Sequence, residues 1–329
     1  MRDRNAPFLR KLLPFLVAGV LAVYPLVLPR FYSSLAIEIF IMALFALSFN
    51  LMFGYAGMLS FGHAVFYGIG AYTAALVLKH AAESMALAIA CSMAVSFVAA
   101  LIIGSICVRF TRTYFIMLTV AFGELVYVIG HRLAGVTGGD DGLVGIPIPQ
   151  ISLPGLPVID LSNIKVYYYF SLVIVAAAAL VLRIIVKSRF GHVLRAIRDS
   201  QQRALFLGLN VRRHLLLCYA LAGLFAGLAG ALLVPFEGMV ALETLHFSTS
   251  GNPILVSILG GTQFFLGPVV GAAIFILVKD TVQNVAEFWM LWMGIILVAT
   301  VMFLPGGVVG FVARHKPFRT AGGIAKKEE

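Results

Sequence analysis

Long, continuously apolar segments occupy most of this 329-residue sequence and limit the folds that it can adopt. A helix needs about 20 apolar residues to cross the ~30 Å hydrocarbon core of a bilayer, and most of the segments are about that long. They do not alternate between apolar and polar residues, which favours helices over the strands of a β-barrel. The segments lie at roughly 12–28, 34–53, 61–78, 85–108, 114–130, 166–186, 214–236, 253–283 and 285–304.

The composition also indicates a membrane protein. Hydrophobic residues make up 61% of the chain and charged residues only 12%. An ordinary soluble domain carries about 25% charged residues, and a soluble core could not hold so many apolar side chains without large exposed patches. We therefore expect an all-α polytopic membrane protein with no separate soluble domain.

The charges are distributed unevenly along the chain. Basic residues gather in residues 1–12, at Arg109 and Arg112, in residues 187–213 and in residues 314–329. Cytoplasmic ends of membrane helices carry an excess of Lys and Arg, so these places, both termini included, are expected in the cytoplasm. The acidic segments 131–165 and 237–252 are then external. The net charge of +10 thus reflects orientation, and we expect no nucleic-acid partner.

Two cytoplasmic termini require an even number of spans. The segment 253–283 contains Gly260-Gly261 and Gly267-Pro268, and these residue types weaken a helix. We therefore expect two short helices there, at 253–265 and 267–283, and about ten spans in total. Eight spans with two half-helices is the alternative.

A second glycine-rich segment, 54–75, is expected to contain a similar broken or short helix. Its Gly62, Phe66 and Gly68 have the same spacing as Gly261, Phe265 and Gly267. Paired glycine-interrupted segments indicate an internal repeat in transporters and point to the substrate path. The candidate path residues are Gly57, Ser60, Gly62, His63, Glu124, Gly260, Gly261 and Gly267.

Two of these residues have competing interpretations. A charged side chain inside a bilayer is costly unless it faces the protein interior or water. Glu124 could therefore contact a substrate or a partner helix, or it could pair with His131 or with a helix end. His63 is expected to form a hydrogen bond between helices rather than to bind a ligand.

Small residues form two pairs with a spacing of four in the segment 214–236. The pairs are Gly223/Gly227 and Ala226/Gly230. Such pairs let two helix backbones approach closely. We expect this packing to lie within the chain, and contact with a second subunit is the alternative.

The basic segment 187–213, which we call the island, holds seven of the 24 Lys and Arg residues and a single acid. Its pattern predicts a helix over 189–198 and another over 200–207 that ends at Gly208. Attraction to anionic membrane lipid explains the charge. Apolar residues 205–207 outside the bilayer additionally suggest docking into a protein groove. The candidate docking residues are Arg195, Arg198, Asp199, Arg203, Ala204 and Gly208.

Sequence motifs of enzymes and of metal sites are absent. The chain contains no GxxxxGK[ST], no HExxH and no GxSxG. Cys91, Cys107 and Cys218 form neither a metal-binding nor a disulfide pattern. The sequence therefore predicts that the chain is not an enzyme and needs no cofactor or metal. Energy from ATP hydrolysis would have to come from a partner protein, and we expect that partner to act on the island.

Seven segments in order carry a resemblance to a known family. They are GYAGMLSFGHAVFYGIGAYTAAL, TYFIMLTVAFGE, TGGDDGLVGIP, SRFGHVLRAIRDSQQRALFLGLNV, GLAGAL, LGGTQFFLGPVVGA and LPGGVVG. Together they cover about 50–311 and resemble the permease subunits of branched-chain amino acid ABC importers, the LivM type. The resemblance implies transport of branched-chain or related amino acids across a bacterial inner membrane. Urea, amide or aromatic acid cargo is one alternative, and an ion-coupled secondary carrier with Glu124 as coupling acid is another.

The resemblance also implies an assembly. A second related permease, two cytoplasmic ABC ATPases and a periplasmic substrate-binding protein would join this chain. Residues 1–311 would form one transmembrane permease domain, with a coupling loop at 187–213 and a periplasmic loop at 131–165. A basic cytoplasmic tail would follow at 312–329. The coupling motif of such permeases usually begins with an acidic–Ala–Ala run, and here only Ala204 and Gly208 of the motif are kept.

Overall fold

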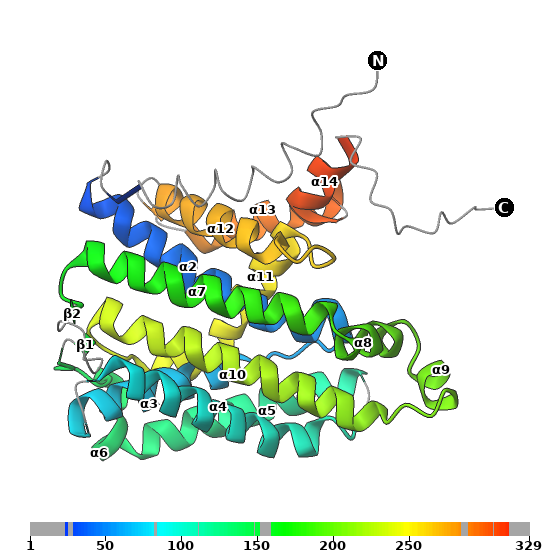
Figure 1. The fold of residues 1–329 in the computed structure, drawn as a ribbon, viewed down its shortest axis with the longest axis horizontal. Coiled ribbons are helices and arrows are strands. Elements are labelled where there is room, and N and C mark those ends of the chain that lie inside the picture. The colour runs from blue at the N-terminus through cyan, green and yellow to red at the C-terminus, as the bar shows by residue number, and fades with distance from the viewer. Residues whose placement is uncertain are drawn as a thin grey trace.

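The computed structural model describes residues 24–25, 29–81, 84–110, 112–147, 149–151, 159–283, 289–304 and 306–315. These residues form a bundle of helices (Figure 1). The main helices are α2 (Arg30–Asn50), α3 (Ala64–His80), α4 (Met85–Cys107), α5 (Arg112–Arg132), α7 (Ile164–Lys187), α10 (Val211–Glu237), α12 (Gly267–Gln283) and α13 (Trp289–Phe303). The shorter helical elements are η1 (Leu51–Tyr55), α6 (Ala134–Thr137), η2 (Gly139–Asp141), α8 (Arg189–Asp199), α9 (Gln201–Phe206), η3 (Leu242–Leu245), η4 (Phe247–Ser250), α11 (Gly251–Gly260) and α14 (Gly307–His315).

The expectation of an all-α membrane protein is confirmed. Five helical stretches are long and apolar enough to cross a bilayer, namely Arg30–Tyr55, Met85–Cys107, Thr113–Arg132, Ile164–Lys187 and Val211–Glu237. Strands in the described residues are limited to β1 (Gln150–Ile151), which pairs antiparallel with β2 (Ile159–Asp160). Nearly all of the predicted first span, 12–28, and most of the basic tail lie outside the described residues.

The two ends of the bundle differ in character. One end, which we call the island end, carries α8, α9 and α14, and the opposite loop end carries α6, β1 and β2 (Figure 1). The long helices α2, α4, α5, α7 and α10 run between these two ends (Figure 1). The ten residues of α11 extend only about 15 Å, too short to cross a bilayer alone. The number of ten spans stays a prediction.

Both predicted helix breaks are present. The first lies between η1 and α3, where Gly57 adopts a positive φ of 71° and the chain is non-helical until Ala64. The second begins at Gly261, whose φ of 107° is a conformation that glycine favours. The predicted helix over 253–265 is therefore wrong at its C-terminal end, because α11 stops at Gly260.

Close packing of small residues forms the centre of the bundle. A methyl group added at Gly70 of α3 would collide with the backbone of Gly227 in α10. A methyl group at Gly230 would collide with the backbone of Tyr67. Helices in lipid gain little from the hydrophobic effect, so van der Waals contact at such positions holds them together. The prediction that the small-residue pairs pack within the chain is confirmed.

We expect Gly230→Ala to lower the melting temperature of the detergent-solubilised protein and its yield as a monodisperse species. The added methyl group would push α10 away from α3, and overpacking of this kind costs roughly 1–3 kcal/mol. The matched control is Gly294→Ala in α13, where no atom lies within 4 Å of the added carbon. Equal melting temperatures for the two variants would contradict the packing argument.

Candidate functional site

The helices α3 and α11 begin near each other inside the bundle. The backbone N–H of Ala64, the first residue of α3, donates a hydrogen bond of 2.9 Å to the hydroxyl of Ser250. Ser250 directly precedes α11, so the N-terminal ends of α3 and α11 meet. Gly62 packs here against the backbone carbonyl of Thr119 in α5, with no room for a side chain. The site thus joins three helices and a non-helical segment.

The structure brings together some of the predicted path residues and separates others. Ser60, Gly62 and His63 are buried next to the start of α3, and the N–H of Gly62 donates to the Ser60 hydroxyl at 3.3 Å. The remaining glycines lie nearer the island end. Gly57 packs against the side chain of Arg198, and Gly261 packs against the backbone of Gly306 next to α14. Gly260 and Gly267 lie on either side of the turn between α11 and α12. A methyl group at Gly260 would collide with the backbone of Gly267, and one at Gly267 would collide with the backbone of Gly261.

His63 connects two helices, as predicted. Its Nε2 lies 2.9 Å from the hydroxyl of Ser48 in α2. The ring is fully buried and stacks on Phe45, with 5.4 Å between ring centroids, and Phe49 and Phe66 contact it edge-on. Aromatic contacts on several sides and a partner from another helix make His63 a packing residue between α2 and α3.

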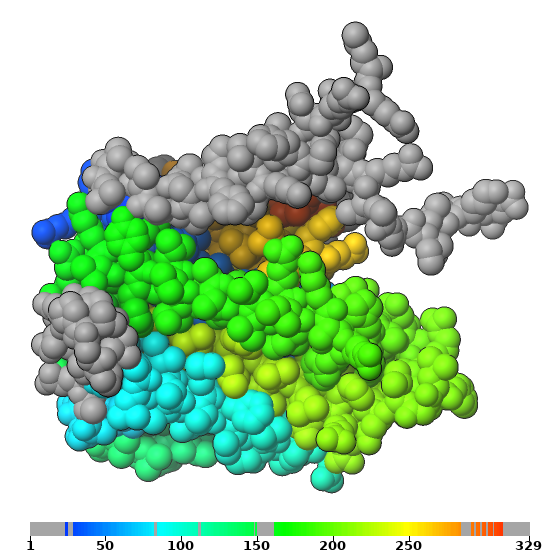
Figure 2. All heavy atoms as spheres, in the orientation of Figure 1, coloured from blue at the N-terminus to red at the C-terminus, as the bar shows by residue number. Residues whose placement is uncertain are grey.

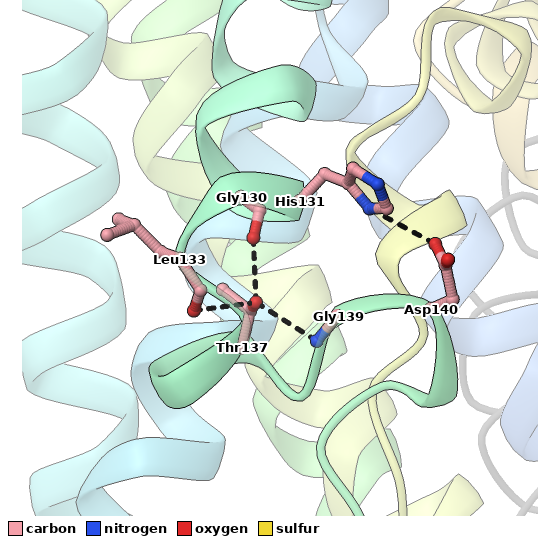
Figure 3. A network of polar contacts seen from close by, with 6 residues as sticks. All are labelled: Gly130, His131, Leu133, Thr137, Gly139 and Asp140. Atoms are coloured by element: carbon pink, nitrogen blue, oxygen red, sulfur yellow. Dashed lines mark hydrogen bonds and ion pairs between the residues drawn. The ribbon is translucent and has the colours of Figure 1, made fainter.

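Glu124 has a different partner from the one expected. Its Oε1 lies 3.7 Å from Nε2 of His246, which belongs to the segment between η3 and η4. The expected pairing of Glu124 with His131 is wrong, because Nδ1 of His131 lies 3.1 Å from Oδ1 of Asp140 (Figure 3). Sequence reasoning missed both His246 and Ser250, although the polar residues between 246 and 252 were a signal of a non-helical segment.

The His131–Asp140 pair belongs to a network that closes the loop end of α5. The hydroxyl of Thr137 lies 2.7 Å from the carbonyl of Gly130 and 3.1 Å from that of Leu133 (Figure 3). A two-way backbone pairing of Leu143 with Val240 then joins this loop to the chain that follows α10. The described part of the predicted loop 131–165 is therefore attached to the segment that leads into η3 and His246.

At the other end of the bundle, two arginines of the island point inward. The guanidinium of Arg195 donates to the carbonyl of Val186 in α7 at 2.8 Å and lies 5.5 Å from the centre of the Tyr55 ring. The guanidinium of Arg198 donates to the carbonyl of Gly54 in η1 at 2.5 Å. These bonds attach α8 to the ends of α7 and α2. Arg195 and Arg198 therefore build the base of the island, and any part they play in docking stays a prediction.

The outer part of the island is α9, which projects from the end of the bundle (Figures 1 and 2). The Ser200 hydroxyl accepts from the N–H of Arg203 and caps the helix, and Ala204 is buried beneath it. Arg203 and Asp199 are exposed. So are the apolar side chains of residues 206 and 207, with 90% and 76% of their surface accessible. The helix ends at Gly208, which has the positive φ of 75° expected for a C-terminal glycine.

A cavity of about 700 Å³ opens beside the island, and the sequence did not predict it. Four separate parts of the chain form it, namely residues 56–59, the α4–α5 region, residues 197–202 and Leu215 of α10. No three His, Cys, Asp or Glu side chains of the described residues are grouped so that they could hold a metal ion. The chain thus has a cavity and the protruding helix α9 at the island end. At its centre, a hydrogen bond joins the starts of α3 and α11.

Comparison with known proteins identifies the family. The profile described as "Branched-chain amino acid transport system / permease component" matches residues 31–304. The chain is 25% identical to the high-affinity branched-chain amino acid transport system permease protein LivM of Escherichia coli K12, over 96% of this chain and 78% of that protein. It is 25% identical to LivH of Salmonella typhimurium LT2, over 70% of this chain and 78% of that protein.

A third relative carries another substrate name. The ribose import permease protein RbsC of Bacillus subtilis 168 is 27% identical over 49% of this chain and 46% of that protein. No solved structure matches the chain. The matched profile covers most of the sequence, including both helix breaks and the island. The chain therefore belongs to the family of permease components of branched-chain amino acid transport systems and is a multi-pass membrane transport subunit.

Proposed function

We propose that this chain is the membrane subunit of an ATP-driven importer for branched-chain amino acids, and that ATPase subunits act on it through α9. The observation that carries the coupling role is the exposure of Phe206 and Leu207 at the tip of a basic helix outside the span-length segments. Large apolar side chains exposed in this way mark an interaction site. The island end would then face the cytoplasm.

The contacts of α8 give the proposed coupling a physical route. A force on α9 passes to α8, because only Ser200 separates the two helices. From α8 it reaches η1 through the bond of Arg198 to Gly54, and α7 through the bond of Arg195 to Val186. The end of α2 leads directly into the break at 57–63 and the start of α3. Movement of the island would thus reorient the helices around the site at Ala64 and Ser250.

The proposed assembly contains a second related permease, two cytoplasmic ATPases and a substrate-binding protein that delivers the cargo from outside. Similarity to both LivM and LivH supports a pair of permeases. Branched-chain amino acids are the proposed cargo because the family profile and the relatives with the largest coverage carry that name. The similarity to a ribose permease over half of the chain indicates that related scaffolds serve chemically different cargo.

The direct test is uptake of radiolabelled leucine into proteoliposomes that contain the assembled importer, with ATP on the ATPase side. Uptake should require ATP and loaded binding protein, and inactivation of the ATPases should abolish it. Uptake that survives inactivation of the ATPases and stops with an uncoupler would contradict the proposal and favour an ion-coupled carrier. Competition with urea, amides and aromatic amino acids on the binding protein would then define the cargo.

Arg203→Glu is expected to abolish leucine uptake and substrate-stimulated ATP hydrolysis while membrane insertion stays normal. Arg203 is exposed on α9 and its side chain has no role in holding α8, so the charge reversal would act on the partner surface. The matched control is Lys165→Glu, the same change at an exposed lysine near the loop end. Normal uptake by the Arg203 variant would contradict the coupling role.

Gly208→Pro should also abolish uptake without preventing insertion, whereas Gly208→Asn should retain most of it. Proline cannot adopt the positive φ of 75° and removes the N–H that bonds to Leu205, so the end of α9 would rearrange. Asparagine tolerates this backbone region better than most residues. Equal uptake by both variants would show that the geometry of the α9 end does not matter.

A further inference from the structure

Glu124 lies deep within the membrane-spanning part of α5. The helix runs over Arg112–Arg132, and at 1.5 Å per residue Glu124 is about 18 Å from one end and about 12 Å from the other. An ionised side chain at such depth is expensive and almost always faces a partner or a water-filled path. The position of Glu124 therefore requires a compensating group.

The described part of this chain supplies no hydrogen-bond partner for the buried oxygen. Oε1 is inaccessible to solvent and makes no hydrogen bond, and Nε2 of His246 stays 3.7 Å away, beyond hydrogen-bonding distance. Glu38 in α2, by contrast, accepts a hydrogen bond of 3.0 Å from the ammonium group of Lys279. Among the described residues, the polar contact of the Glu124 carboxylate is therefore that of Oε1 with His246, which is longer than a hydrogen bond.

The surroundings of Glu124 are open on one side. The side chain is 39% exposed, and the apolar Met117, Leu125 and Val128 of the same helix are exposed around it. A surface that carries a carboxylate at this depth is poorly suited to face lipid tails. A polar group approaching from outside this chain could therefore reach the exposed part of the Glu124 side chain, whereas Oε1 is turned inward to His246.

The neighbouring imidazole is held in place by other contacts. Nδ1 of His246 lies 2.8 Å from the hydroxyl of Ser248, and the ring packs edge-on against Tyr127 with 5.0 Å between centroids. Phe247 adds a further aromatic ring, with its centroid 4.7 Å from that of His246. These contacts hold the imidazole beside the Glu124 carboxylate. The pair of Glu124 and His246 thus offers acceptor atoms to a small ammonium group.

We propose that Glu124 binds the α-ammonium group of the amino acid cargo during translocation, with Tyr127 and His246 as neighbouring wall residues. This inference rests on the proposed function, because it names the part of the cargo that the path recognises. A charge-assisted hydrogen bond from the ammonium to the carboxylate would supply the compensation that the described residues do not. The site accepts cargo that carries a cationic amino group.

Ligand analogues test the inference on the wild-type protein. The assembled importer, in detergent and without its binding protein, is heated with leucine or with 4-methylpentanoate, which has the same carbon skeleton and carboxylate but no amino group. Leucine should raise the melting temperature because it binds the folded state, and 4-methylpentanoate should not. Equal shifts, or no shift with leucine up to its solubility limit, would overturn the proposal.

Variants test the inference during transport. Glu124→Gln should reduce ATP-dependent leucine uptake by about 10-fold or more, the scale expected for loss of a hydrogen bond between charged groups. It should leave the amount of assembled complex near wild type. Glu124→Asp, which keeps the carboxylate, should retain more uptake than Glu124→Gln. The matched control is Glu243→Gln, at an exposed acid in η3 that should transport normally.

The outcomes separate this inference from the proposed function. A wild-type importer that takes up no leucine with ATP would refute the proposed function itself. Normal leucine uptake by Glu124→Gln, alongside an active wild type, would refute the ammonium site alone. If Glu124→Gln fails to assemble, the comparison of leucine with 4-methylpentanoate on the wild type still decides the question.

Discussion

Close backbone contact between α3 and α10 is the constraint on which the rest of this structure depends. Gly70 of α3 has no room for a side chain against the backbone of Gly227, and Gly230 of α10 has none against that of Tyr67. Helices in a bilayer are held by such packing because lipid offers no hydrophobic penalty for separation. The contact fixes the depth at which α3 begins. The chain between η1 and α3 must therefore run non-helically inside the bundle, and Ser250 satisfies the first backbone donor of α3.

The same arrangement connects the two regions of functional interest. The island is bonded through Arg198 to Gly54, just before the break that leads to α3. The start of α3 meets the start of α11, and the segment that precedes α11 carries His246 beside Glu124. A displacement at the island end thus has a short covalent and hydrogen-bonded route to the centre of the bundle. This geometry suits a transport subunit that receives mechanical energy from outside itself.

Much of the fold could be predicted because it depends on local sequence. Apolar length predicted the helices, glycine predicted both breaks, and Gly208 predicted the end of α9. His63 was correctly expected to bond between helices. Of the alternatives left open for Glu124, pairing with His131 is wrong, although His131 is only seven positions away and was the obvious local candidate. The actual neighbour, His246, comes from a distant segment whose position depends on how α10 and α11 pack.

The sequence by itself determined the class of protein, since the free energy of placing apolar or charged residues in a bilayer depends on composition and order. It also determined the family, through seven segments spread along the chain. The tertiary structure alone decided which island arginines turn inward to Val186 and Gly54 and which stay exposed. It likewise placed the buried oxygen of Glu124 where no described residue forms a hydrogen bond with it. Such contacts join segments far apart in the chain, and only helix packing brings their atoms within bonding distance.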